Sequence, residues 1–164
     1  MRYVSIHRNT EKEIQRDSDK MEKLKCYLSS LYINSDWDST FLVITKEDGV
    51  QFGKKIKKRI VSKPSYQKNT EFTKKRIKTK DDGREKIMYF VPIKSFLNSI
   101  CCMSYLIFDR PSEYDEYNFT DVYSSYLPCL STKGKVVFLD SKEGNDKMKK
   151  KYPQLEQYVE FVEL

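Results

Sequence analysis

The chain has 164 residues, a length typical of one domain, and folding at this size buries roughly 70% of the surface of the extended chain. Lys and Arg total 31 against 24 Asp and Glu, so the formal net charge is +7, and 12 Tyr and 9 Phe are spread over the whole sequence. This composition excludes a globally disordered chain, and we expect one domain spanning residues 1–164. The longest apolar stretch, Ile100 to Phe108, is far too short to cross a bilayer. No secretory signal precedes it, so we expect a cytoplasmic protein without a membrane partner.

The first third of the sequence predicts a short strand followed by a long helix. Arg2 to His7 alternates between polar and apolar residues, which is typical of a strand. Thr10 and Glu13 then have the spacing of a capping box, and apolar residues recur at helical intervals after them. These signals predict a helix from about residue 10 to 32.

Two hairpins are predicted in the middle of the chain. Phe41 to Ile44 is rich in β-forming residues, and Asp48-Gly49 has the chemistry of a tight turn, so the return strand is expected from Val50 to about Ile60. A second Asp-Gly turn separates Phe72–Thr79 from the apolar segment Lys86–Val91. We expect the four strands to neighbour one another.

The last third is more varied. Ser95 to Met103 predicts either a short buried helix or a buried strand, and Asp109 to Tyr126 is acidic and rich in Tyr, which indicates a long ordered loop. Lys135 to Leu139 predicts a strand, and the apolar spacing from Met148 to Val162 predicts a C-terminal helix that starts or kinks near Pro153. The expected fold class is therefore α+β. Its mainly antiparallel sheet is built from two hairpins plus the later strand, and is packed by an N-terminal and a C-terminal helix.

The distribution of charge is the most informative feature of the sequence. Residues 51–86 carry fourteen basic and four acidic side chains, a net charge of +10, so the rest of the chain sums to −3. On a strand, alternate residues such as Lys74, Arg76 and Lys78 line one face, and a cationic ribbon of this kind suits nucleic acid or a nucleoprotein. A solvated, aggregation-resistant edge and an acidic protein partner are the alternatives. The candidate nucleic-acid-binding residues are Lys54, Lys55, Lys57, Lys58, Arg59, Lys63, Lys74, Lys75, Arg76, Lys78, Lys80 and Arg84.

A segment of opposite charge follows, at residues 109–121, where five acidic side chains accompany one Arg. Such a segment is expected of a solvated surface loop, and it also suits a basic protein surface. The candidate partner-binding residues are Trp37, Asp115, Glu116 and Tyr117. Together the two surfaces favour a small non-enzymatic binding protein. One specific version is a phage or mobile-element inhibitor of a host nuclease or of a nucleic-acid-guided complex.

The sequence lacks the residues that several common catalytic mechanisms and cofactor sites require. A single histidine, His7, excludes mechanisms that need two histidines, and the five glycines form no phosphate-binding cluster. The cysteines lack the paired spacing of a zinc site, so we expect neither a cofactor nor a metal. Cys101 and Cys102 lie in the most apolar run of the chain, and we expect them to be reduced and buried.

Two other functions stay open. Asp140-Ser141-Lys142 follows an apolar strand and is similar to the acid-x-Lys half of the PD-(D/E)xK nuclease motif. With Asp121 or Asp109 as the upstream acid, the carboxylates of such a Mg²⁺-dependent nuclease would hold the metal while Lys142 steadies the phosphate. A toxin-like ribonuclease without histidine is a further enzymatic possibility. The remaining alternative is an interaction module that dimerises through its Tyr-rich loop and C-terminal helix.

Overall fold

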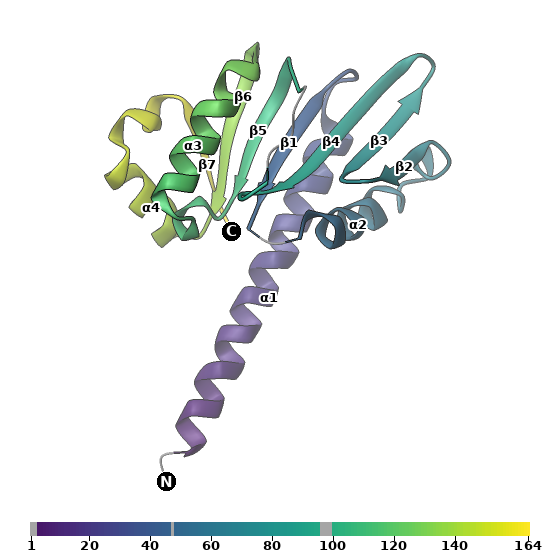
Figure 1. The fold of residues 1–164 in the computed structure, drawn as a ribbon. Coiled ribbons are helices and arrows are strands. Elements are labelled where there is room, and N and C mark those ends of the chain that lie inside the picture. The colour runs from purple at the N-terminus through teal and green to yellow at the C-terminus, as the bar shows by residue number, and fades with distance from the viewer. Residues whose placement is uncertain (1–2, 47, 96–99) are drawn as a thin grey trace.

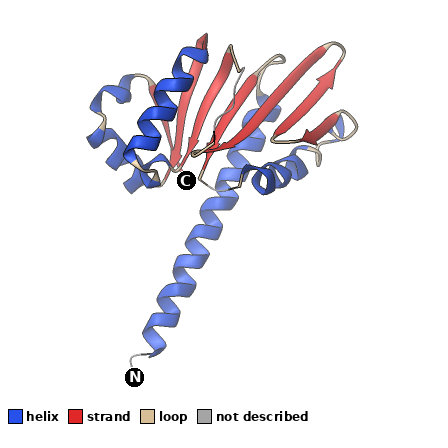
Figure 2. Cartoon of the chain, in the orientation of Figure 1, coloured by secondary structure: helices blue, strands red, loops and turns tan. Residues whose placement is uncertain are grey.

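A computed structural model describes residues 3–46, 48–95 and 100–164 of the chain, with side chains from residue 18 onward. Its helices are α1 (Tyr3–Asn34), α2 (Gly49–Ile60), α3 (Glu116–Tyr126) and α4 (Lys142–Lys151). Its strands are β1 (Thr40–Thr45), β2 (Thr70–Thr73), β3 (Arg76–Asp81), β4 (Arg84–Pro92), β5 (Met103–Asp109), β6 (Leu130–Asp140) and β7 (Val159–Glu163). Figure 1 labels these elements, and Figure 2 shows the strands as one continuous sheet.

The strands are arranged in the order β2-β3-β4-β1-β5-β6-β7. The β4-β1, β1-β5, β5-β6 and β6-β7 pairs are parallel, whereas only β2-β3 and β3-β4 are antiparallel. The protein is therefore an α/β fold, and the expected mainly antiparallel α+β sheet is wrong. The physical reason is that α3 connects β5 to β6 and α4 connects β6 to β7, and a helical crossover returns the chain to the same end of the sheet, so that the next strand runs parallel.

Helices cover both faces of the sheet. On one face, Leu28 of α1 and Ile56 of α2 pack into the cluster that contains Val43 of β1. On the other face, Phe119 of α3 packs into the cluster that contains Ile44, the next residue of β1. Successive strand residues point to opposite faces, so a central strand between two helical layers must be apolar on both sides. The N-terminal part of α1 extends beyond this body (Figure 1).

The first predicted hairpin is wrong, because its return strand is the helix α2. The Asp48 carboxylate accepts a hydrogen bond from the Val50 amide at 2.8 Å and so caps the helix. A Cβ atom at Gly49 would lie 2.7 Å from the Phe90 carbonyl oxygen of β4. The Asp-Gly pair thus starts a helix that lies very close to the sheet, whereas the same pair in a hairpin would form the turn.

Two other predictions of local structure are wrong near the N-terminus and after β5. The helix α1 begins at Tyr3, so the segment expected as an opening strand continues into the predicted helix, while Arg2 lies outside the described residues. The expected loop at 109–126 contains α3, which is capped by a hydrogen bond from the Asn118 amide to the Asp115 carboxylate. Periodic burial of rings on α3 stabilises a helix in this acidic segment.

Other predictions are confirmed. The strand at Phe41–Ile44 is β1, and Lys135–Leu139 lies within β6. The second hairpin is the β3-β4 pair, but its first strand is shorter than expected, because Phe72 belongs to β2 and a turn at Lys74–Lys75 separates β2 from β3. The expected C-terminal helix is wrong beyond residue 151, since α4 ends before Pro153 and the chain then forms β7 parallel to β6. The helix or strand expected at 95–103 falls partly on residues 96–99, outside the described residues, and Met103 begins β5.

None of the helices in the described part of the chain combines the length and the hydrophobicity that a bilayer-spanning segment requires. The cysteines differ from the expectation of burial. Cys26, Cys101 and Cys102 are exposed, and Cys129 is half-buried. Cys26 accepts a hydrogen bond from the Arg59 guanidinium at 2.9 Å.

Candidate functional site

The predicted cations of residues 54–59 lie on α2, where a helical arrangement replaces the expected strand stripe. Lys54, Lys55 and Lys58 are exposed, while Ile56 and Ile60 are fully buried against the sheet. No carboxylate of the described residues forms an ion pair with these three lysines. Lys54 and Lys58 are four residues apart and therefore lie on the same side of the helix, away from the core.

A second group of cations alternates along β3. Arg76, Lys78 and Lys80 flank the buried residues Ile77 and Thr79, so they lie on the face of the sheet opposite α2. Lys78 and Lys80, with Lys68 of the preceding loop, line a surface hollow of about 280 Å³ beside the edge strand β2. The cations therefore flank the β2 edge on both of its sides, and do not form one flat ribbon.

The chain neutralises some of the predicted cations. Arg59 is paired with Glu22 of α1, Lys78 with Glu85 at 3.3 Å and Arg84 with Asp81 at 3.4 Å. The remaining predicted cations without an ion pair to a described carboxylate are half-buried or exposed. They are Lys57 and Arg76, both half-buried, and Lys63, Lys74, Lys75 and Lys80, all exposed.

Lys86, the last of the fourteen cations, is buried and 2% exposed. Its ammonium group donates hydrogen bonds to the carbonyls of Tyr32 at 3.0 Å and Ile33 at 3.1 Å, and to the Tyr66 hydroxyl at 3.1 Å. It also lies 4.9 Å from the centre of the Trp37 ring. Lys86 thus caps the last turn of α1 and contributes nothing to an exposed binding surface.

The candidate partner-binding residues have separate environments. Trp37 stacks on Tyr66 and lies under the Arg84 guanidinium at 5.0 Å, so the indole is part of the hairpin packing. Asp115 caps α3 and Glu116 pairs with Lys151 at 3.1 Å. Tyr117 is 76% exposed on α3 and remains available to a partner.

The nuclease candidates also differ in environment. Asp140 is 3% exposed, and its carboxylate accepts hydrogen bonds from the Ser112 amide at 3.0 Å and the Ser141 amide at 2.8 Å. Asp121 and Lys142 are exposed on α3 and α4. Within the described ranges, no group of three or more His, Cys, Asp or Glu residues is placed to hold a metal ion. The assignment of Asp121, Asp140 and Lys142 to catalysis stays a prediction.

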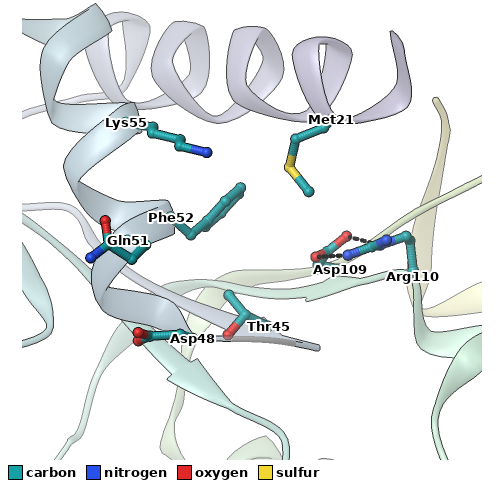
Figure 3. A pocket seen from close by; sticks show the side chains of 8 residues that line it. All are labelled: Met21, Thr45, Asp48, Gln51, Phe52, Lys55, Asp109 and Arg110. Carbon is teal, nitrogen blue, oxygen red and sulfur yellow. Dashed lines mark hydrogen bonds and ion pairs between the residues drawn. The ribbon is translucent and has the colours of Figure 1, made fainter. Parts of the chain in front are cut away.

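A site that sequence reasoning missed lies where β1 and β5 end. From β1 the chain passes through α2 on one face, and from β5 it passes through α3 on the other face, so this is the switch point of the doubly wound sheet. Ligands of open α/β sheets bind at such points, outside the carboxyl ends of the strands. Here a cavity of about 260 Å³, the switch-point cavity, is lined by Met21, Thr45, Asp48, Gln51, Phe52, Lys55, Asp109 and Arg110 (Figure 3).

An ion pair borders this cavity. The Asp109 carboxylate is 2% exposed as a residue and accepts hydrogen bonds from Arg110 Nε at 3.0 Å and from its second guanidinium nitrogen at 3.3 Å. Burial raises the pKa of Asp109, and the neighbouring Arg110 charge opposes that increase. Arg110 has a left-handed backbone with φ of 52°. A buried carboxylate paired with a guanidinium, which also lies 3.7 Å from a Glu113 oxygen, is therefore held at the edge of a solvent-accessible space.

The helix N-termini at this edge of the sheet carry carboxylates of the chain itself. Asp48 caps α2, Asp115 caps α3, and Asp140 accepts from the Ser141 amide at the start of α4. Free amides and the positive end of a helix dipole ordinarily bind phosphate at such positions. In this chain, Asp48 and Asp115 each accept from one of those amides, and the Ser141 hydroxyl accepts from the Gly144 amide of α4. The carboxylates at these positions repel an anion that approaches along the helix axis.

Comparisons with known proteins give a likeness at the level of fold. No family model matches the sequence, and no curated protein matches it. Among solved structures, the chain is similar to the large terminase from a thermophilic bacteriophage, with 11% sequence identity and a TM-score of 0.53. The match covers 85% of this chain but 36% of the terminase chain, so this protein spans about a third of that neighbour. The likeness extends to the α/β fold of a phage protein.

Proposed function

We propose that this chain binds nucleic acid through a cationic surface on α2 and the β2-β3 hairpin. The cationic surface is defined by eight exposed lysines, Lys54, Lys55, Lys58, Lys63, Lys68, Lys74, Lys75 and Lys80. The observation that carries the proposal is that none of them forms an ion pair with a carboxylate in the described part of the chain. Unneutralised cations repel one another until a polyanion approaches.

Proximity brings these lysines into one region. The helix α2 contacts β2, β3 and β4, and Phe72 of β2 lies against Gly53 of α2. Lysines of the helix and of the hairpin therefore surround the same edge strand. Phosphates that bind there release condensed counterions, and this release gives nucleic-acid binding its steep dependence on salt.

The fold likeness to a phage large terminase is compatible with a phage or mobile-element origin, and it identifies no ligand. In the finer version of the proposal, the chain is an inhibitor of a host nuclease or of a nucleic-acid-guided complex. The cationic surface would contact the bound RNA or DNA, and exposed Tyr117 would contact the protein. Capture from a host that expresses the target, with and without nuclease treatment, tests this version.

The direct test is a titration with labelled single-stranded and duplex oligonucleotides at several salt concentrations. We expect the double variant Lys54→Glu, Lys58→Glu to weaken binding at least tenfold and to reduce the slope of log K against log salt by about 1.4 for single strands, since each phosphate contact contributes about 0.7. Affinity measured by fluorescence anisotropy gives both quantities.

A matched control makes the same change in net charge elsewhere. The double variant Lys133→Glu, Lys150→Glu replaces two exposed lysines outside the cationic surface, one on β6 and one on α4. It should retain nearly the wild-type slope. Equal weakening by both double variants would mean that net charge alone attracts the oligonucleotide, and the assignment to α2 would then be wrong.

A further inference from the structure

The switch-point cavity has an apolar side and a cationic side. Met21 of α1 and Phe52 of α2 both point into the cavity, and the Lys55 side chain extends toward them from α2 (Figure 3). The Phe52 ring is half-buried and is held edge-on against Phe90, with ring centres 5.6 Å apart. The remaining lining consists of the Asp109–Arg110 ion pair with Thr45, Asp48 and Gln51.

We propose that this cavity takes a nucleoside phosphate, with the base against Phe52 and Met21 and the phosphate at Lys55. A half-buried aromatic ring offers a π-face on which a base can stack, whatever its sequence. Lys55 is exposed and has no described carboxylate partner, so its ammonium group is available to an anion.

The position of the acids decides where the phosphate lies. Asp48 occupies the N-terminus of α2, which excludes the usual placement of phosphate on the first amides of that helix. Lys55 is almost two helical turns further along α2. The phosphate is therefore held by a side chain at the mouth of the cavity, and the base occupies the part nearer to the sheet.

The size of the cavity limits the ligand. Its volume of about 260 Å³ lies just below the range of roughly 300 to 1,000 Å³ that is usual for small-molecule sites. One nucleoside fits this scale better than a dinucleotide does. A compact site of this kind selects a single base, either as a free nucleotide or as one nucleotide of a longer strand.

Lys55 belongs to both the cavity and the cationic surface. A strand that follows α2 would therefore bring one of its nucleotides to the cavity, and this part of the inference rests on the proposed function. A free nucleotide would need the cavity alone. A free nucleotide and a nucleotide of a bound strand would be recognised by the same side chains, so the experiment must distinguish these two ligands.

The first measurement is calorimetric titration with deoxyadenosine monophosphate, deoxyadenosine and inorganic phosphate. We expect the monophosphate to bind more tightly than either of its parts. Phe52→Leu keeps apolar volume but removes the ring, and should weaken monophosphate binding about fivefold or more through lost stacking. Lys55→Gln should weaken it at least threefold. Lys150→Gln changes an exposed lysine of α4 on the other face of the sheet, and should leave affinity within twofold of wild type.

The second measurement uses an oligonucleotide with a single 2-aminopurine, whose fluorescence falls when the base stacks on a ring. Quenching that disappears in Phe52→Leu places a nucleotide of the strand in the cavity. Monophosphate binding without such quenching assigns the cavity to free nucleotides. Thermal melting of Phe52→Leu checks its fold, and Lys55→Gln, at an exposed site, provides the test if Phe52→Leu is unfolded.

The outcomes separate this inference from the proposed function. If the Phe52 and Lys55 variants bind the monophosphate like wild type, or if inorganic phosphate binds equally well, the cavity assignment is wrong. Oligonucleotide binding that depends on Lys54 and Lys58 would then still support the proposed function. Conversely, monophosphate binding that requires Phe52, without any oligonucleotide binding, would support the cavity and contradict the cationic surface.

Discussion

Two buried charges at opposite ends of the central strands are stabilised in different ways. Lys86, near the start of β4, is surrounded by carbonyls, a hydroxyl and ring faces, all of them neutral. Asp109, at the end of β5, is paired with the charged Arg110 beside a cavity. The first arrangement joins a helix to the sheet, whereas the second leaves a charged pair within reach of solvent. A buried charge with neutral partners therefore indicates a structural role here, and a pair that borders open space indicates a candidate site.

The largest effect is expected from Lys86→Met, which keeps most of the side-chain volume but removes the ammonium group. The carbonyls of Tyr32 and Ile33 lose a charged donor, and the aromatic faces lose a cation. The free energy of unfolding should fall by about 2 to 3 kcal/mol, measured by urea denaturation. Lys80→Met on the neighbouring strand, where the side chain is exposed, serves as the control. Similar stability of the two variants would contradict a structural role for Lys86.

A smaller, pH-dependent effect is expected from Arg110→Gln. Because the folded-state pKa of Asp109 is raised by burial, the stability that its protonation contributes is present at low pH and is lost as pH rises through that pKa. Without the Arg110 charge the pKa of Asp109 rises further. The variant should therefore lose about 1 to 2 kcal/mol at pH 7 and less at pH 4, measured by urea unfolding across that range.

The control for this comparison removes the acid as well. In the double variant Asp109→Asn, Arg110→Gln, the additional loss at neutral pH should disappear, because the buried Asp109 carboxylate is no longer there to be ionised. A deficit in Arg110→Gln that is the same at every pH would show that the guanidinium acts by packing alone.

The smallest effect is expected from Tyr66→Phe. The hydroxyl of Tyr66 donates to the Ile33 carbonyl at 3.1 Å and accepts from Lys86, so the variant removes two contacts while it keeps the stacked ring. We expect a loss of about 1 kcal/mol in thermal or urea unfolding. A loss as large as that of Lys86→Met would mean that the hydroxyl, and not the carbonyls of α1, is the main partner of the ammonium group.

The elements that could be predicted from sequence are those whose local residues are compatible with only one secondary structure. The β3-β4 hairpin has a tight turn between two β-rich runs, and Gly83 adopts φ of 76° in it. Asp48-Gly49 is compatible with both a hairpin turn and a helix start, and the contact of Gly49 with β4 decides between them. Similarly, the apolar spacing before and after Pro153 predicts one helix, whereas parallel pairing with β6 makes Val159–Glu163 a strand.

The candidate site was less accessible to sequence reasoning. The exposure of Lys54 and Lys58 depends on α2 being a helix, because on the expected strand they would share a face with the buried residues Ile56 and Ile60. The burial of Lys86 depends on the placement of α1 against β4. The switch-point cavity depends on strand order, because β1 and β5 become neighbours only after the chain has passed through β4. The available local signal was the acid that ends each apolar run, as Asp109 and Asp140 do.

The enclosure of Lys86 also affects any chemical survey of this protein's amines. A water-soluble acylating reagent reaches lysines on the outer face of α2 and in the β2-β3 turn, but not an ammonium group that is covered by rings and the end of α1. In the native state, Lys86 should therefore not be acylated, and it can serve as the unreactive reference for the other lysines. Its labelling would report opening of the fold, which distinguishes loss of structure from ligand protection at the other lysines.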